Sequence, residues 1–273
     1  MRAPPDRCFT RASAHTRKVD GAMTTIALYS NKGGVGKTAA AVNLAYLAAI
    51  GGASTLLCDL DAQGSSTFYF RVQPGIKRKA RGLVKGKKEV LDSVKATDYA
   101  GLDLLPADFS HRRIDLEYAE HKKPTARLAK ALEPLRADYD FVILDCPPTI
   151  NLLAENIFTT ADMLLVPLIP TPLSLMAHRQ LLDFLRDHSY RSERVYTFFS
   201  MVDARKRLHR DLITEARKTL PHVLQTAIPY LAAVEQMGVH RAPVGAFAAS
   251  TSAASAYRDL WTEVQSIVTH SPM

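Results

Sequence analysis

The sequence predicts an α/β fold in which one doubly wound, mainly parallel sheet carries helices on both of its faces. Short apolar segments with the composition of buried strands alternate with helical patterns from residue 24 onward, which is the arrangement that produces parallel sheets. Three of these strand candidates end in a motif of glycines or aspartates. Doubly wound sheets bind ligands at the carboxyl ends of their strands, so these motifs predict a ligand site there.

The predicted elements follow one another in a regular order. Strand candidates span 24–30, 54–60, 102–106, 141–144, 162–168 and 195–202, and helical patterns span 39–50, 110–120, 124–136, 173–188 and 208–220. Residues 222–229 and the helical pattern at 257–268 close the set. Residues 68–98 contain scattered glycines and only a short helical pattern near 89–95, so we expect a mobile surface insertion there.

Length and composition are those of an ordinary globular protein. The chain has 273 residues, of which 47% are apolar and 23% are charged, and we place a single domain at residues 23–270. Residues 1–22 are expected to be a disordered extension, or to lie upstream of the true start at Met23. No run approaches the roughly 18 uninterrupted apolar residues of a membrane span.

The cysteines and histidines show no pattern of a metal site. Cys8, Cys58 and Cys146 form no C-x-x-C pair, which predicts neither a disulfide framework nor a metal knuckle and suits a reducing cytosol. We interpret Cys146 as a small apolar core residue. The nine histidines lack metal-ligand spacing, and we expect those at positions 111, 121 and 209 to be solvated.

Residues 29–38, with the sequence YSNKGGVGKT, form the strongest motif. Its glycines allow the backbone to aim successive N–H groups at an anion, and the helix that begins near Thr38 adds the positive end of its dipole. Lys37 would reach the β- and γ-phosphates of a nucleotide, and the Thr38 hydroxyl would hold Mg²⁺. Asn31 replaces the first glycine of the usual motif, and Lys32 adds a second lysine. The alternative is a glycine-rich turn without a ligand.

Two further strand candidates end in aspartates. Residues 58–64, CDLDAQG, follow one strand, and Asp145 follows the apolar residues FVIL and precedes two prolines. Asp145 would hold Mg²⁺ through a bound water, and the prolines would stop the strand. The alternatives are a polar surface turn at the first site and a structural cap at the second.

Residues 32–38, KGGVGKT, resemble the deviant Walker A box of the ParA/MinD ATPases, which are P-loop NTPases. The resemblance covers residues 23–268 and includes all three motifs in the same order. It implies that ATP is the nucleotide and that Lys32 contacts the nucleotide of a partner subunit, which makes dimerisation depend on ATP. It also implies that Asp61 positions the attacking water and that Asp59 supports the Mg²⁺ shell, although Ala62 stands where the family usually has proline.

The resemblance also assigns the nucleotide contacts. Two later segments flank the adenine in relatives, and the second lacks the arginine that often follows its proline. The expected nucleotide-binding residues are Lys32, Gly33, Gly34, Val35, Gly36, Lys37, Thr38, Ala39, Met201, Asp203, Pro229 and Tyr230. The expected catalytic residues are Lys32, Lys37 and Asp61, and the expected metal ligands are Thr38, Asp59 and Asp145. Without a fixed arginine finger we expect slow hydrolysis in the absence of a stimulating partner.

The net charge of +8 is unevenly distributed. Residues 71–88 contain eight basic side chains and no acid, and a second basic group at 205–218 is diluted by acids. Each group is either a solvated face or a contact for a polyanion. We take the second group as the candidate DNA contact and residues 77–88 as a competing site. The candidate residues are Arg205, Arg207, Arg210, Arg217 and Lys218 of this group, together with Arg241.

The resemblance implies a ParA-type partitioning or positioning ATPase. Its ATP-bound homodimer would bind DNA non-specifically, and a ParB-like or cargo-adaptor protein would release it by stimulating hydrolysis. This predicts a cytoplasmic, nucleoid-associated protein that moves a plasmid, a chromosome or a protein cargo. The first alternative is a MinD-like regulator that cycles on a membrane, but Arg258 is the only basic residue of 257–268. The second is an iron–sulfur relative, which would need bridging cysteines.

Overall fold

The computed structural model describes residues 23–77, 83 and 87–270, and within them one sheet organises the chain. Its strand order is β3-β4-β2-β5-β1-β6-β7-β8, with β1 near the centre between β5 and β6. Every recorded strand pair is parallel except that of β3 with β4. The predicted single α/β sheet is therefore confirmed.

The central strands are short apolar segments that are almost entirely buried, and each ends at a polar or proline-containing motif. All five residues of β1 and of β2 are buried. The strands are β1 (Thr24–Leu28), β2 (Thr55–Asp59), β3 (Lys95–Ala96), β4 (Leu102–Leu105), β5 (Phe141–Asp145), β6 (Met163–Leu168), β7 (Val195–Val202) and β8 (Val223–Pro229).

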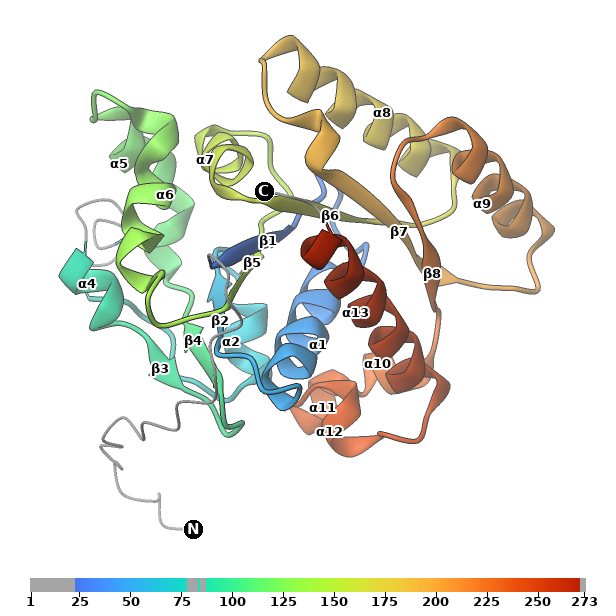
Figure 1. Cartoon of the computed structure of the whole chain (residues 1–273), viewed down its shortest axis with the longest axis horizontal. Helices are drawn as coiled ribbons and strands as arrows, with labels where there is room; N and C mark the ends of the chain where they lie inside the picture. The colour runs from blue at the N-terminus through green and yellow to red at the C-terminus, as the bar shows by residue number, and fades with distance from the viewer. Residues whose placement is uncertain (1–22, 78–82, 84–86, 271–273) are drawn as a thin grey trace.

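Helices cover both faces of the sheet (Figure 1). One face carries α1 (Lys37–Ile50), α2 (Ser65–Tyr69), α10 (Ala232–Glu235), α11 (Met237–His240), α12 (Val244–Phe247) and α13 (Ser252–His270). The other carries α4 (Lys87–Leu91), α5 (Ile114–Ala119), α6 (Arg127–Leu132), α7 (Leu152–Thr160), α8 (Pro172–Asp187) and α9 (Arg207–Thr219). Short 3₁₀ helices span Phe109–Arg113, Pro124–Ala126, Glu133–Leu135 and Ser192–Arg194.

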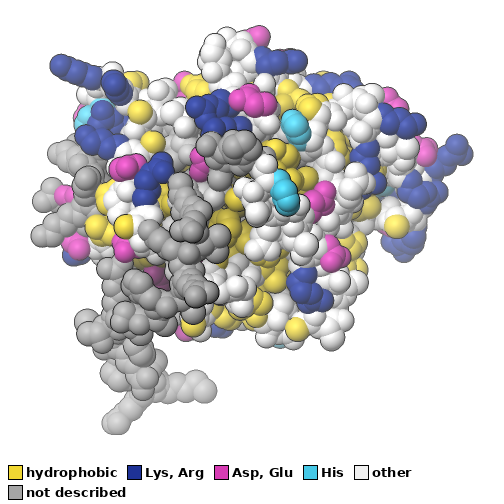
Figure 2. Space-filling view, viewed as in Figure 1, with side chains coloured by type: hydrophobic (Ala, Val, Ile, Leu, Met, Phe, Trp, Pro, Cys, Tyr) yellow, Lys and Arg dark blue, Asp and Glu magenta, His cyan; other side chains and the backbone are white. Residues whose placement is uncertain are grey.

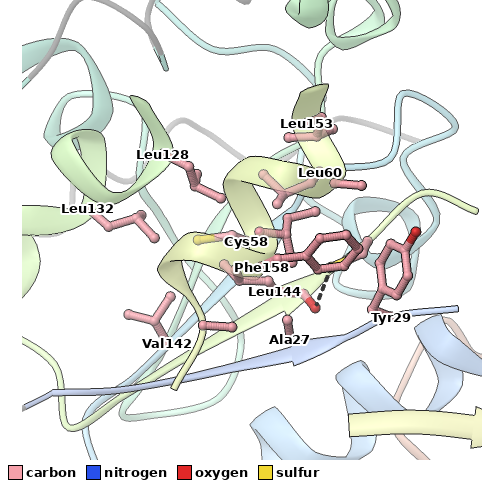
Figure 3. Close-up of a cluster of buried hydrophobic side chains, with 14 of the residues drawn as sticks. Ala27, Tyr29, Cys58, Leu60, Leu128, Leu132, Val142, Leu144, Leu153 and Phe158 are labelled. Carbon is pink, nitrogen blue, oxygen red and sulfur yellow. Dashed lines mark hydrogen bonds between the residues drawn. The ribbon is translucent and has the colours of Figure 1, made fainter. Parts of the chain in front are cut away.

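The hydrophobic core between the sheet and helices α6 and α7 holds Tyr29, the residue that directly follows β1, in place (Figure 3). Tyr29 packs edge-on against Phe158 of α7, with ring centroids 4.9 Å apart. Its hydroxyl donates to the backbone carbonyl oxygen of Thr149 at 2.9 Å. The residue that opens the glycine loop is thus bonded to the turn that follows β5.

Several segments differ from the sequence-based expectations. The helical pattern at 124–136 is broken into a 3₁₀ turn, α6 and a second 3₁₀ turn, because prolines occupy the first turn of both 3₁₀ segments. The expected mobile insertion at 68–98 instead contributes Ile76, Leu83 and Val90 to the hydrophobic core.

Residues 78–82 and 84–86 of the basic run lie outside the described part of the chain, as does the predicted extension at 1–22. None of the described helices is both long and apolar enough to span a bilayer.

Candidate functional site

The glycine loop connects β1 to α1 at the carboxyl edge of the sheet, as predicted. Gly34 and Gly36 have φ angles of 71° and 92°, a left-handed conformation that side chains rarely adopt. At Gly36 a Cβ atom would also lie 2.8 Å from Ser200 Oγ, at the end of β7. Both glycines are therefore required by the backbone, and the loop can present its N–H groups to an anion at the start of α1.

The two lysines of the loop lie in different environments. Lys37 is only 7% exposed, and its Nζ donates to the carbonyl oxygen of Lys32 at 3.0 Å inside the loop. Burial lowers the pKa of Lys37, whereas the nearby carboxylate of Asp145 opposes this effect. The Nζ of Lys32 instead lies 3.5 Å from the Oγ of Ser174, near the start of α8. Lys37 can thus contact a phosphate bound to its own loop, and Lys32 is directed toward α8.

Strand pairing brings the predicted metal ligands together. Asp59 and Asp145 are register partners on β2 and β5, and both are about 1% exposed. Thr38 donates its hydroxyl hydrogen bond to Asp145 Oδ1 at 3.2 Å. Within the described residues no donor reaches the buried Asp59 Oδ1. Two carboxylates and a hydroxyl are the kind of oxygen ligands that Mg²⁺ prefers, and Asp59 Oδ1 still has its acceptor capacity to offer. These residues therefore fit the ion.

Two hydroxyl residues that the sequence reasoning missed hold these carboxylates. Ser66 Oγ donates to Asp145 Oδ2 at 2.7 Å. The backbone N–H and the hydroxyl of Thr67 both donate to Asp59 Oδ2 at 2.7 Å. Both residues lie on α2, directly after the Asp61 loop, and are fully buried. Their position after the DLDAQG motif is the signal that could have identified them.

Asp61 is less constrained than the other two aspartates. Its Oδ1 accepts from the N–H of Gln63 at 2.9 Å, and its backbone carbonyl oxygen accepts from Gly64 at 2.9 Å. The side chain is half-buried. An aspartate held by a turn, with part of its carboxylate open to solvent, can orient a water molecule near the glycine loop.

The buried carboxylates are costly to keep charged. Burial raises the pKa of Asp59 above its ordinary value, with the nearby Asp145 as the second cause, and burial also raises the pKa of Asp145. Because the folded chain then binds protons more readily than the unfolded chain, these groups make folding more favourable as the pH falls from neutral toward about 4.

The Asp59→Asn variant is expected to be more stable than the wild type at pH 8 in the presence of EDTA. The gain should be about 1–2 kcal/mol, since one pKa unit corresponds to about 1.4 kcal/mol, and it should shrink at pH 5.5. Urea unfolding measures it. The exposed Asp259→Asn is the control and should change stability by less than about 0.5 kcal/mol. A destabilised Asp59→Asn protein at pH 8 would contradict this account.

The two segments predicted to flank the adenine lie side by side. Val202 pairs with Pro229 across β7 and β8, and the N–H of Tyr230 donates to the carbonyl oxygen of Val202 at 3.0 Å. Met201 has a φ angle of 55° and follows Ser200, which contacts the glycine loop. The side chain of Asp203 accepts two hydrogen bonds from Arg205 at 3.0 Å. The contact of these residues with adenine stays a prediction.

The predicted DNA contacts fall into two places. Five of them lie on α9 or just before it, where Figure 2 shows Lys and Arg side chains gathered along the right edge. Arg241 lies at the end of α11, well apart from α9 in Figure 1. Its Nε donates to the carbonyl oxygen of Phe68 at 2.9 Å. The six residues therefore do not form one surface.

The expectation for the histidines was wrong at two positions. His111 and His209 are 4% and 6% exposed. Nδ1 of His209 accepts from the N–H of Asp203 at 3.1 Å, which stabilises the turn before α9. Burial lowers the pKa of His111 to about 4.

Within the described residues no group of three or more histidine, cysteine and carboxylate side chains is placed to hold a metal ion by itself. Cys58 and Cys146 are buried in the core.

The comparisons with known proteins agree with this geometry. A family model described as "AAA domain" matches residues 23–195. The sporulation initiation inhibitor protein Soj of Bacillus subtilis is 31% identical over 245 residues, which is 88% of this chain and 97% of Soj. The chain belongs to the ParA/MinD family of ATPases, on its ParA (Soj) side.

Solved structures of this family's fold overlay most of the chain. A cobyrinic acid a,c-diamide synthase from Mycobacterium smegmatis, with a bound ATP analog and magnesium, has a TM-score of 0.76 at 24% identity and covers 91% of this chain and 96% of its own. A putative plasmid partition protein from Borrelia burgdorferi, bound to AMPPNP, has a TM-score of 0.72 at 20% identity and covers 89% and 99%. At these identities the two structures support the fold alone.

Proposed function

We propose that this member of the ParA/MinD family is a Mg²⁺-dependent ATPase whose ATP-bound homodimer binds DNA non-specifically. A partner protein that stimulates hydrolysis then releases it, and this cycle partitions DNA or positions a cargo. Lys37, Thr38 and the loop amides would bind the phosphates and Mg²⁺, with Asp59 and Asp145 around the ion. Asp61 would orient the attacking water, and Mg²⁺ would offset the negative charge of the phosphates.

The observation that supports the dimer best is the position of Lys32. Its ammonium group lies 3.5 Å from Ser174 Oγ, near the start of α8. Next to Ser174, Leu173 and Met176 are 64% and 51% exposed, and Ile150 after β5 is 44% exposed. A cation and exposed apolar side chains at the carboxyl edge of the sheet favour a second copy as the partner of this face.

The Lys32→Ala variant tests this proposal. We expect it to bind ATP, because Lys37 and the loop amides remain, but to stay monomeric in ATP and Mg²⁺. Calorimetry measures the binding, and gel filtration with light scattering measures the mass. Lys130→Ala on the exposed side of α6 is the matched control and should dimerise normally. A Lys32→Ala protein that dimerises like the control would refute the proposed role of Lys32.

The α9 group is the part of the chain that we assign to DNA. Within α9 only His209 and Ala216 are buried, so its basic side chains are open to a polyanion. Part of this positive charge is offset by neighbouring acids, because Arg207 lies 3.4 Å from Asp211 and Arg205 pairs with Asp203. Arg241 is not adjacent to this group and is left out of the proposed surface.

Binding to duplex DNA in the presence of ATP should weaken steeply with salt. If about four to six phosphates are contacted, the logarithm of the affinity falls with a slope of about −0.9 per contact. Replacing Arg207 and Lys218 with alanine should reduce the magnitude of the slope by about two. Fluorescence anisotropy at several salt concentrations measures both, with Lys130→Ala as the control. Affinity that is flat between low and moderate salt would reject the DNA assignment.

The MinD-like alternative receives no specific support. A membrane-cycling protein needs a helix with a free apolar face. The apolar side of α13 is already packed against the sheet and α1 through Tyr257, Leu260 and Trp261. Trp261 also contacts Phe141 of β5, with ring centroids 5.1 Å apart. Co-sedimentation with liposomes separates the two functions.

A further inference from the structure

A surface pocket of about 470 Å³ lies beside the loop that carries the predicted catalytic Asp61. Residues 62–64 of this loop form one wall, and Val72, Pro74 and Ala107 add apolar surface. Two exposed rings border the pocket, since Phe68 is 49% and Phe109 is 66% exposed. Large apolar side chains exposed around a hollow are typical of a binding site for another molecule.

The described lining of the pocket contains basic side chains and no acidic one. Arg71 and Arg241 line it, and Arg71 is already paired with Asp98, whose Oδ2 accepts from the Nε of Arg71 at 3.0 Å and from its Nη2 at 2.6 Å. The guanidinium carbon of Arg241 lies 4.6 Å from the centre of the Phe68 ring, and that of Arg112 lies 4.0 Å from the Phe109 ring. Within the described residues no carboxylate pairs with Arg241 or Arg112. Arginines stacked on aromatic rings keep the edge of the guanidinium available for a carboxylate.

The wall of this pocket is linked through α2 to the carboxylates of the proposed metal ligands. The N–H of Ala107 donates to Thr67 Oγ1 at 2.8 Å, and the same hydroxyl donates to Asp59 Oδ2 at 2.7 Å. The preceding residue of α2, Ser66, donates to Asp145. The following residue of α2 is Phe68, which lines the pocket. A molecule bound against Phe68 and Ala107 would therefore contact α2, the helix whose hydroxyl groups hold both proposed metal ligands.

We propose that this pocket binds a segment of another protein in which an apolar or aromatic side chain is flanked by acidic residues, and that its binding changes the rate of hydrolysis. The apolar wall accepts the apolar side chain, and Arg112 and Arg241 pair with the acids. Nucleic acid is the poorer occupant, because only two arginines line the pocket and a phosphate backbone has no group for the apolar wall. The effect on hydrolysis rests on the proposed function, whereas the binding does not.

Fluorescence anisotropy with synthetic peptides tests the binding to the full chain. The probe is a labelled peptide of alternating Phe or Leu and Asp or Glu. One comparison peptide replaces the acids with Lys, and another replaces the apolar residues with Ser. We expect only the first to bind the wild type, and we expect Arg112→Glu with Arg241→Glu to weaken it at least about tenfold. The exposed Arg191→Glu is the charge-matched control and should bind normally.

Three results would overturn the binding proposal. The first is equal affinity of the probe peptide for the wild type and the double variant. The second is displacement of the peptide by duplex DNA, which would make nucleic acid the occupant. The third is peptide binding that is lost when ATP is added, which would mean that a second copy covers the pocket. Dimerisation and DNA binding are measured without peptide, so a failure of the proposed function is seen separately.

Covalent filling of the pocket tests the effect on hydrolysis. Gln73 lines the pocket and is exposed, so Gln73→Cys in a Cys8→Ser background can be alkylated with a bulky maleimide. We expect the ATPase rate to change about fivefold or more. The same reagent on Gln265→Cys, an exposed position of α13, should leave the rate unchanged. Equal rates for the two alkylated proteins would overturn the proposed coupling.

Discussion

Replacing Lys37 with alanine is expected to abolish nucleotide binding at micromolar concentrations. The Lys37 ammonium lies inside the glycine loop, 3.0 Å from the carbonyl oxygen of Lys32, where the β- and γ-phosphates would bind. A hydrogen bond to a charged group is worth roughly 1.5–3 kcal/mol, so the loss of one or two such contacts should raise the Kd for ATP by about 10²-fold or more. Titration calorimetry measures it.

The folded state provides the control for this prediction. Burial lowers the pKa of Lys37, which means that its charge is costly to keep in the folded protein. Lys37→Ala should therefore melt no lower than the wild type in the absence of nucleotide. An unchanged affinity for ATP would show that Lys37 does not bind the phosphates. A large loss of thermal stability would mean that unfolding, and not the missing ammonium group, explains the weaker binding.

Replacing Asp61 with alanine is expected to slow hydrolysis and to trap the ATP-bound dimer on DNA. Asp59 is bonded to Thr67, and Asp145 to Thr38 and Ser66, whereas Asp61 is held only through the turn at Gln63 and Gly64. Removal of a group that positions a reacting water typically costs about 10²–10⁴ in rate. Phosphate release measures the rate, and light scattering with ATP measures the dimer.

Asp61→Asn separates the charge of this residue from its role in the turn. The amide oxygen can still accept from the N–H of Gln63, so the loop should keep its shape while the carboxylate is lost. We expect Asp61→Asn to hydrolyse ATP as slowly as Asp61→Ala. A protein with either substitution that remains monomeric in ATP, or that hydrolyses ATP at the wild-type rate, contradicts the role assigned to Asp61.

The sequence predicted the central sheet well because its strands have a simple physical signature. Strands β1, β2, β5 and β7 begin and end within about two residues of the predicted ranges, since a strand buried on both faces is a short apolar run. Three of these runs end in motifs that depend only on local chemistry. The positions of Lys37, Asp59 and Asp145 at one edge then follow from parallel pairing.

The parts that could not be predicted depend on contacts between distant residues. Ser66 is separated from Asp145 by 79 positions. Its place after the DLDAQG motif puts it near the site, but the sequence does not specify which carboxylate it contacts. Helix α7 was not predicted, although Asn151 caps it by accepting from the N–H of Ala154 at 3.1 Å. The burial of His111 and His209 follows from packing around them and not from their neighbours in the chain.

The hydrogen bond from Tyr29 to Thr149 links the glycine loop to the turn that follows β5. Tyr29 begins the segment that would cradle the phosphates, and Thr149 directly precedes the exposed Ile150. A shift of the glycine loop would therefore be passed through this one hydrogen bond to the turn that carries Thr149 and Ile150. Because Ile150 is exposed, this turn is where such a shift would reach the surface of the molecule.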